Sequence, residues 1–221
     1  MDVAREKMLE IFNSSLESDD PLSWFEDLYK QSDEQRNLIP WDWREPHPYL
    51  VEWVKSTNYR GKALVVGCGL GEDAAFLSKM GWEVTAFDIS NSAIDWAKNL
   101  HTGVPVEWLV EDLLKLPSSW TASYDLVLEV HIIQAIPREI GKIASERLAP
   151  LVSEGGYLVC IGKLKETRDE GPGPPWPLSL DFIERIGEGL EKVELLISKI
   201  EGKESTRYRA VWNKKKLQVI D

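Results

Sequence analysis

The stretch Lys62–Met80, KALVVGCGLGEDAAFLSKM, predicts a strand, a tight turn and a helix in succession. Ala63–Val66 is a continuous apolar run, which is typical of a parallel strand buried on both faces. Gly67, Gly69 and Gly71 come next, and glycine allows backbone angles and close approaches that a β-carbon would block. The apolar residues after the turn recur at helical spacing. We therefore expect a ligand to lie against the glycine turn.

The spacing of the glycines indicates which ligand this is. The dinucleotide fingerprint is GxGxxG with a pyrophosphate at the helix N-terminus, whereas here the glycines run GxGxG and Glu72 and Asp73 follow at once. Two carboxylates there would repel a pyrophosphate but suit a ligand with a positive centre. S-adenosylmethionine fits because it carries a sulfonium and an ammonium group, and a nicotinamide dinucleotide is the distant alternative. The residues expected to bind this cofactor at the turn are Gly67, Cys68, Gly69, Gly71 and Asp73.

Acidic residues follow the next two predicted strands. Asp88 closes the strand Glu83–Ile89, about 20 residues past the glycines, where it can accept hydrogen bonds from both ribose hydroxyls. The alternative is that Asp88 merely begins the turn into the next helix. A third strand, Val106–Val110, ends in Glu111 and Asp112, and an acidic side chain there can accept a hydrogen bond from the amino group of adenine.

Together these residues resemble the class I S-adenosylmethionine-dependent methyltransferases, from about Lys62 to Trp212. The resemblance implies that the three glycines form the family's glycine motif, that Asp88 is the ribose acid, and that Ile89, Asp112 and Leu113 lie beside adenine. Val65 departs from the pattern, since many members carry an acidic residue two before the first glycine. With that departure, ALVVGCGLGEDAAFLSKMGWEVTAFDIS and the earlier segment PWDWREPHP are similar to the thiopurine and thiol methyltransferase branch.

The segment before the glycine turn reads as a cover over the site. Residues 2–31 look helical and amphipathic, with a break at Ser18–Pro21, and they either cover the substrate or simply pack on the sheet. Pro40–Pro48 is too rich in proline for a helix or central strand, and its tryptophans are costly to leave in water. Trp41 could face the sulfonium, and Arg44 could bind the donor's carboxylate. The alternative is that the rings of Trp41 and Trp43 are both core anchors. We expect residues 1–61 to form the cover and residues 62–221 the core.

The fourth predicted strand, Tyr124–Val130, places Glu129, His131 and Gln134 at the ligand side of the sheet. Methyl transfer needs a base only when the nucleophile keeps its proton at the working pH. A thiolate needs none. For a hydroxyl or an amine we predict His131 as the base and Glu129 near the donor's positive centre. The alternative is that His131 packs or caps the segment before Pro137.

The last third of the chain predicts a helix from 138 to 149, a fifth strand Tyr157–Gly162, and an antiparallel pair. Between them, the proline-rich segment Glu166–Leu178 is a candidate lid that carries Trp176. The expected fold is a single α/β, Rossmann-like domain with a mostly parallel seven-stranded sheet in the order 3-2-1-4-5-7-6 and an N-terminal helical extension, as the resemblance implies. The acceptor pocket should be lined by Trp41, Trp43, His131, Gln134 and Trp176.

Composition restricts the remaining choices. A chain of 221 residues is one domain of ordinary size, and its net charge of −11 argues against a nucleic-acid substrate. Its 2 cysteines make no disulfide framework, and no apolar stretch is long enough to span a membrane, so we expect a cytoplasmic protein. We expect no metal. The predicted function is methyl transfer to a small molecule, with a thiol or small aromatic acceptor favoured. A donor-binding module without catalysis and an oxidoreductase stay open, as does the oligomeric state.

Overall fold

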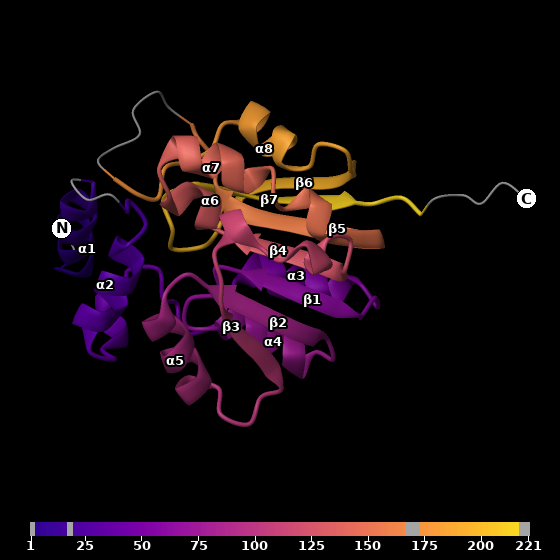
Figure 1. The fold of residues 1–221 in the computed structure, drawn as a ribbon. Helices are drawn as coiled ribbons and strands as arrows, with labels where there is room; N and C mark the ends of the chain where they lie inside the picture. Colours follow the sequence, from indigo (N-terminus) through magenta and orange to yellow (C-terminus); the bar gives the residue numbers. More distant parts are fainter. Residues whose placement is uncertain (1–2, 17–19, 167–172, 217–221) are drawn as a thin grey trace, which may run out of the picture.

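A seven-stranded sheet forms the centre of the protein in the computed structural model, which describes residues 3–16, 20–166 and 173–216. The order is β3-β2-β1-β4-β5-β7-β6, and β7 runs antiparallel to both of its neighbours (Figure 1), so the expected sheet order is confirmed. The strands are β1 (Lys62–Val66), β2 (Glu83–Asp88), β3 (Val106–Val110), β4 (Tyr124–Val130), β5 (Val152–Lys163), β6 (Glu191–Lys199) and β7 (Thr206–Asn213).

Helices connect the strands and precede them. The α-helices are α1 (Val3–Ser15), α2 (Trp24–Ser32), α3 (Pro48–Ser56), α4 (Glu72–Lys79), α5 (Asn91–Leu100), α6 (Ile132–Ala135), α7 (Arg138–Ser145) and α8 (Leu180–Ile186). Short 3-10 helices are η1 (Arg36–Leu38), η2 (Leu113–Lys115), η3 (Ser118–Trp120) and η4 (Ala149–Leu151).

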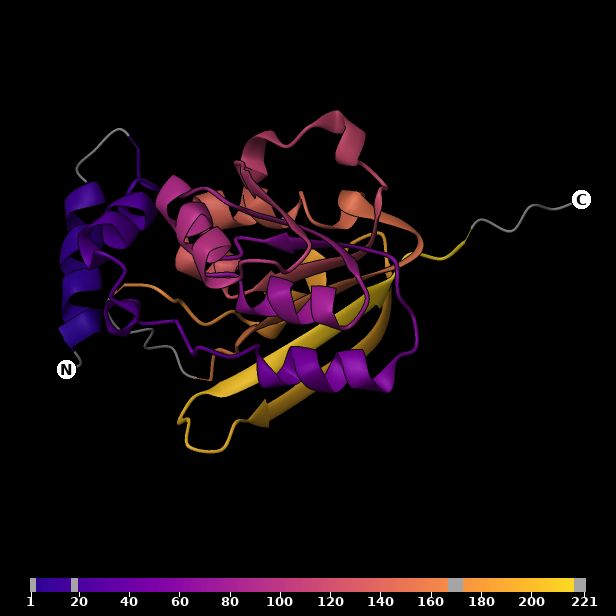
Figure 2. The same cartoon turned by 90° about the horizontal axis from the view of Figure 1, so that it is seen from below.

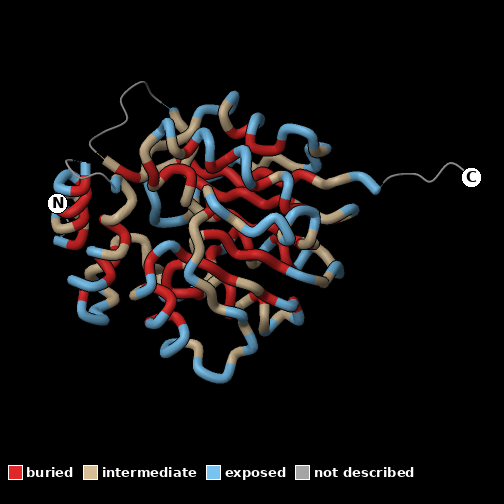
Figure 3. The backbone as a smooth tube through the Cα atoms, viewed as in Figure 1, coloured by how far each residue is buried: buried red, intermediate tan, exposed pale blue. Residues whose placement is uncertain are grey.

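Two apolar clusters show that the sheet is covered on both faces. Side chains of α3 and α4 pack on one face, against strand residues such as Val65 and Leu128. Side chains of α5, α7 and α8 pack on the other face, against residues such as Val66 and Val127. Figure 3 shows the buried residues concentrated along the central strands. The central strands β1 and β4 are largely apolar because both of their faces are buried.

The N-terminal helices α1 and α2 stand together at one end of the molecule, in both Figure 1 and Figure 2. Glu26 of α2 attaches them to the core, because its carboxylate accepts hydrogen bonds from Ser90 Oγ at 2.6 Å and from the Ser92 amide at 3.0 Å. These two groups lie at the start of α5. A carboxylate at this position also interacts favourably with the helix dipole.

Some boundaries differ from those expected. The second N-terminal helix begins at Trp24, beyond Pro21, and the helix expected over 138–149 is α7, which ends at Ser145. Pro48 opens helix α3, which the prolines around it concealed. Proline fits the first turn of a helix because the amide it lacks has no partner there. Residues 167–172 of the expected lid lie outside the described residues. No helix in the described ranges is long and apolar enough to cross a membrane.

Candidate active site

The glycine turn between β1 and α4 requires its glycines. Gly67, Gly69 and Gly71 have φ angles of 58°, 51° and 84°, which side chains with a β-carbon rarely adopt. A β-carbon would also run into Ile132 at the first position and would lie 2.9 Å from Tyr29 Oη at the second. The turn is therefore shaped for a close approach by its neighbours.

Asp88 holds the turn from the end of β2. Its carboxylate accepts hydrogen bonds from the Gly69 amide at 2.9 Å and from the Ser90 amide at 3.0 Å. The residue is 6% exposed, and burial raises the pKa of its carboxyl group. Asp88 thus supports the turn into α5, as the alternative interpretation held, and it also lines the cavities beside the glycines. Each carboxylate oxygen has further lone pairs that can accept a hydrogen bond from a ligand.

Two adjoining cavities, of about 240 Å³ and about 60 Å³, lie at the carboxyl ends of the central strands. They share Phe25, Val66, Gly67, Asp88 and Ile132. The smaller cavity is also lined by the residues predicted for adenine, Ile89, Glu111, Asp112 and Leu113. The larger one is also lined by Trp41, Cys68, Gly69, Gly71 and Asp73. This layout fits S-adenosylmethionine, because a nucleoside and a charged amino-acid chain need connected spaces on either side of the ribose acid.

Aromatic residues of the N-terminal segment wall the larger cavity. The Trp41 ring packs edge-on against Trp24 and Tyr29, with ring centroids 5.8 and 6.1 Å apart, and its Nε1 donates a hydrogen bond to Tyr29 Oη at 3.0 Å. Trp41 is therefore both anchored in the core and exposed to the cavity. Tyr29 had no signal in the sequence beyond its place on an amphipathic helix.

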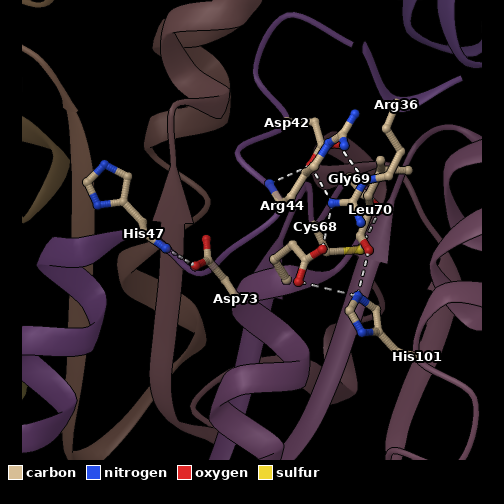
Figure 4. A network of polar contacts seen from close by, with 10 residues as sticks. Arg36, Asp42, Arg44, His47, Cys68, Gly69, Leu70, Asp73 and His101 are labelled. Carbon is tan, nitrogen blue, oxygen red and sulfur yellow. Dashed lines mark hydrogen bonds and ion pairs between the residues drawn. The ribbon is translucent and has the colours of Figure 1, made fainter. Parts of the chain in front are cut away.

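Polar contacts fasten the segment before α3 onto the first turn of α4 (Figure 4). Arg36 donates hydrogen bonds to Asp42 at 2.6 and 2.7 Å and to Glu72 at 2.6 Å. The His47 amide donates to Asp73 Oδ1 at 2.7 Å, and burial raises the pKa of Asp73 to about 6. The two acids that follow the glycines thus hold this segment in place. Arg44 is solvent-exposed and outside the cavity lining.

His131 follows β4, and both of its ring nitrogens form hydrogen bonds within the protein. Gln134 Nε2 donates to the Lys163 and Trp176 carbonyls, so Gln134 Oε1 faces His131 Nδ1, at 3.0 Å, as an acceptor. This network assigns the proton of the neutral ring to Nδ1. His131 Nε2 then accepts a hydrogen bond from Arg207 Nη1 at 2.8 Å. Burial lowers the pKa of His131 to about 4, so the ring is neutral near pH 7.

Only some of the residues predicted near the acceptor line the larger cavity. Trp43 and His131 line the larger cavity, whereas Glu129, Gln134 and Trp176 are outside its lining. Glu129 is fully buried and accepts hydrogen bonds from the Ile132 and Ile133 amides, and burial raises the pKa of its carboxyl group to about 7. The Trp176 ring packs edge-on against Phe12 at 5.6 Å.

Three cationic side chains that the sequence analysis missed also line the larger cavity: Arg5, Lys163 and Arg207. The available signals were weak. Lys163 ends a strand, and Arg207 and Arg209 alternate with Tyr208 and Ala210 in another. Within the described residues, no group of three or more His, Cys, Asp or Glu side chains is arranged to hold a metal ion.

Comparisons with known proteins agree with this geometry. Residues 63–156 match a family model described as a methyltransferase domain. The chain is 25% identical over 159 residues to a probable thiol methyltransferase of Arabidopsis thaliana, covering 69% of this chain and 68% of the relative. It is 24% identical over 172 residues to a thiopurine S-methyltransferase of Legionella pneumophila, covering 70% and 77%.

A solved structure shares the fold over nearly the whole chain. The N-methyltransferase NodS from Bradyrhizobium japonicum, in complex with S-adenosyl-L-homocysteine, superposes with a TM-score of 0.66 at 16% identity and covers 95% of this chain and 99% of its own. The sheet order, the glycine turn with its acid at the end of β2 and the matched methyltransferase domain all lead to one conclusion. The chain is an S-adenosylmethionine-dependent methyltransferase with the class I fold.

Proposed function

We propose that this enzyme transfers the methyl group of S-adenosylmethionine to the sulfur of a small thiol, aliphatic or aromatic. The observation that carries the proposal is the state of His131, whose two ring nitrogens are both engaged by Gln134 and Arg207. A site in which this base is occupied favours an acceptor that reacts as a preformed anion, as a thiolate does. Relatives named as thiol, thiocyanate and thiopurine methyltransferases support the same choice.

We assign donor binding to the residues around the two cavities. When bound, S-adenosylmethionine supplies an electrophilic methyl group on a cationic sulfur. Asp88 accepts hydrogen bonds from the ribose hydroxyls, and Trp41 offers an aromatic face to the cation. The turn residues Gly67, Cys68, Gly69 and Gly71, with Asp73, surround the amino-acid part. The adenine lies among Ile89, Glu111, Asp112 and Leu113.

The protein's catalytic contribution is orientation and exclusion of water. Residues 1–61 act as a cover that closes the larger cavity, with Trp43 and His131 on its acceptor side. In-line displacement requires the nucleophile, the methyl carbon and the leaving sulfur to be aligned, and alignment in a closed site can account for most of the acceleration. The base role of His131 and the electrostatic role of Glu129 stay predictions for hydroxyl or amine acceptors. Gln134 and Trp176 lie outside the cavity lining and support the residues that form it.

A matched series of acceptors tests the proposal. Thiophenol, phenol and aniline share one ring and differ in the accepting atom, so their turnover with labelled S-adenosylmethionine compares sulfur, oxygen and nitrogen directly. We expect thiophenol to react fastest at equal concentration, and calorimetry with S-adenosylhomocysteine serves as the control for an intact donor site. Faster methylation of phenol or aniline would contradict the proposal and would return His131 to the role of base.

A further inference from the structure

We propose that the acceptor carries an acid group, a carboxylate being the simplest, and that this group binds at Arg207 and Lys163, apart from the sulfur that receives the methyl group. This inference rests on the proposed transfer to a thiol and adds a second point of recognition to it. The proposal is carried by the arrangement of cations on the acceptor side of the larger cavity.

Arg207 and Lys163 are placed directly opposite one another on the antiparallel strands β7 and β5. Like charges in this position destabilise a sheet. No carboxylate pairs with either side chain within the part of the chain that the structure describes. Arg5 of α1 lines the same cavity. In a chain with a net charge of −11, a convergence of cations that have no carboxylate partner among the described residues favours an anionic ligand.

Arg209 shows what the same strand does with a purely structural arginine. It lies two residues after Arg207, on the same face of β7, and is equally buried, at 4% against 5% exposure. Arg209 Nε donates to Glu194 Oε1 at 2.7 Å, and its Nη1 donates to the Tyr49 carbonyl at 2.7 Å. Arg207, the residue at the cavity, lacks such a carboxylate partner among the described residues. The missing charge is therefore expected from the ligand.

Buried donors beside Arg207 point the same way. Arg207 Nε and His47 Nε2 are both buried without a hydrogen-bond partner in the described residues. His47 Nδ1 accepts from the Tyr49 amide, so Nε2 carries the proton of the neutral ring. The Trp43 ring contacts both side chains, the His47 ring at 5.0 Å between centroids and the Arg207 guanidinium at 5.0 Å. Buried donors rarely stay unpaired, and an oxyanion would provide acceptors.

The carboxylates around the same cavity are occupied elsewhere. Asp42 and Glu72 accept from Arg36, and Asp73 accepts from the His47 amide. Glu45 is solvent-exposed, and no ion pair joins it to Arg207 or Lys163 among the described residues. The contact from Arg207 Nη1 to His131, backed by Gln134, fixes the guanidinium in place. His131 is in this view a positioning residue.

The reaction balances without a further reactant. The thiol loses its proton to water before the transfer, and the resulting thiolate is the nucleophile. The thiolate sulfur forms a bond to the methyl carbon with its own electron pair. The bond from that carbon to the sulfonium breaks, and its pair returns to the sulfur of S-adenosylhomocysteine. The acid group keeps its charge throughout, so it can anchor the substrate and the product alike.

Acid and amide versions of one thiol test the subsite. Mercaptoacetate and mercaptoacetamide have nearly the same shape, as do 2-mercaptobenzoate and 2-mercaptobenzamide. With rates corrected for the thiolate fraction of each compound, we expect kcat/KM to be about 10- to 100-fold higher for the acids, the range for a hydrogen bond to a charged group. Arg207→Gln and Lys163→Gln should bring this ratio towards one, mainly through KM. Lys98→Gln, on an exposed surface of α5, should leave it unchanged.

Stability separates binding from a structural role. Arg207→Gln removes a positive charge that lies opposite Lys163. The melting temperature of this variant should therefore be unchanged or higher than that of the wild type. A lower melting temperature together with weaker binding of S-adenosylhomocysteine, at an unchanged acid-to-amide ratio, would make Arg207 structural and overturn the inference.

The remaining outcomes distinguish this inference from the proposed function. Amide thiols that react as well as acid thiols would leave thiol methylation standing and overturn the subsite. Benzoate that binds the S-adenosylhomocysteine complex and is lost in Arg207→Gln, with no turnover of any thiol, would support the subsite and overturn the thiol acceptor. Thiocyanate carries no second acid group. If the kcat/KM for thiocyanate equals that for mercaptoacetate and falls by the same factor in Arg207→Gln, the cations bind the reacting atom and the inference is wrong.

Discussion

Asp88 has two roles, because its carboxylate organises the glycine turn and the residue also lines both cavities. Replacing it with alanine leaves the Gly69 amide without its partner and removes the acceptor for the ribose. We expect Asp88→Ala to weaken binding of S-adenosylhomocysteine by about 1 to 3 kcal/mol, the range for losing a hydrogen bond to a charged group. Calorimetry measures this loss, and a thermal melt confirms that the variant folds. Unchanged affinity in a folded variant would remove Asp88 from the donor site.

His131 has a φ angle of 65°, a conformation that asparagine tolerates, so His131→Asn is a substitution the backbone accepts. The shorter side chain loses the acceptor for Arg207 Nη1. With mercaptoacetate we expect KM to rise roughly tenfold while affinity for S-adenosylhomocysteine is kept. Mercaptoacetamide should respond less. Equal losses for both thiols and for the donor would make the residue part of the general packing.

The pH dependence of turnover separates the two roles of His131. Because burial lowers its pKa to about 4, the ring is neutral above that value. With a thiol acceptor, kcat/KM should therefore rise with the thiolate fraction alone and show no step near the ordinary histidine pKa of about 6.5. A pH–rate profile of the wild type and His131→Asn measures this. With a phenol acceptor, an acidic limb that disappears in the variant would support the base role.

Among the elements, the pair formed by α1 and α2 depends on Glu26 for its attachment to α5. Burial alone would raise the pKa of Glu26, but hydrogen bonds from Ser90 and Ser92 and the contact with Lys30 outweigh it and lower the pKa to about 2. A carboxyl whose pKa is lower in the folded state stabilises the protein above its unfolded pKa. That stabilisation is lost as the pH falls from about 4.5 towards about 2.

Glu26→Gln tests this attachment. Losing about 1 kcal/mol of hydrogen bonding should lower the melting temperature by about 2 to 4 °C at neutral pH in a chain of this size. The gap between variant and wild type should narrow as the pH falls through the window above. Glu10→Gln, at an exposed position on α1, is the matched control and should change little. A gap that stays constant down to pH 2 would contradict the role given to the charge.

Elements encoded by local patterns were predictable, and those defined by distant contacts were less so. β1, β2 and β4 read directly as apolar runs, and Gly67, Gly69 and Asp88 stand close to them in the sequence. β5 begins at Val152, earlier than expected, because Val152 pairs with Tyr124. The strand therefore includes the glycines that the sequence analysis placed before it. The contact between His131 and Arg207 spans 76 residues, so no local pattern announces it.

At the scale of the whole molecule, the cations on the acceptor side of the cavity are opposite in sign to the net charge of the chain. The chain has 37 acidic and 26 basic residues, yet Arg5, Lys163 and Arg207 face the larger cavity without a carboxylate partner in the described residues. The net charge of the protein repels an approaching anion, whereas these three cations attract it at short range. The two effects differ in how salt screens them, because exposed charges are screened and buried ones much less so.

This difference predicts an unusual salt dependence for an anionic acceptor. Raising the ionic strength from about 10 to about 150 mM shortens the screening length from about 30 Å to about 8 Å, which removes most of the long-range repulsion but little of the short-range attraction. We expect kcat/KM for mercaptoacetate to rise a few-fold over this range at saturating S-adenosylmethionine, and that for mercaptoacetamide to stay level. Steady-state rates in a series of sodium chloride concentrations measure both. A fall for mercaptoacetate would mean that the cations act as an open, attractive surface patch, and the anion would then meet Arg207 and Lys163 in water rather than inside the closed cavity.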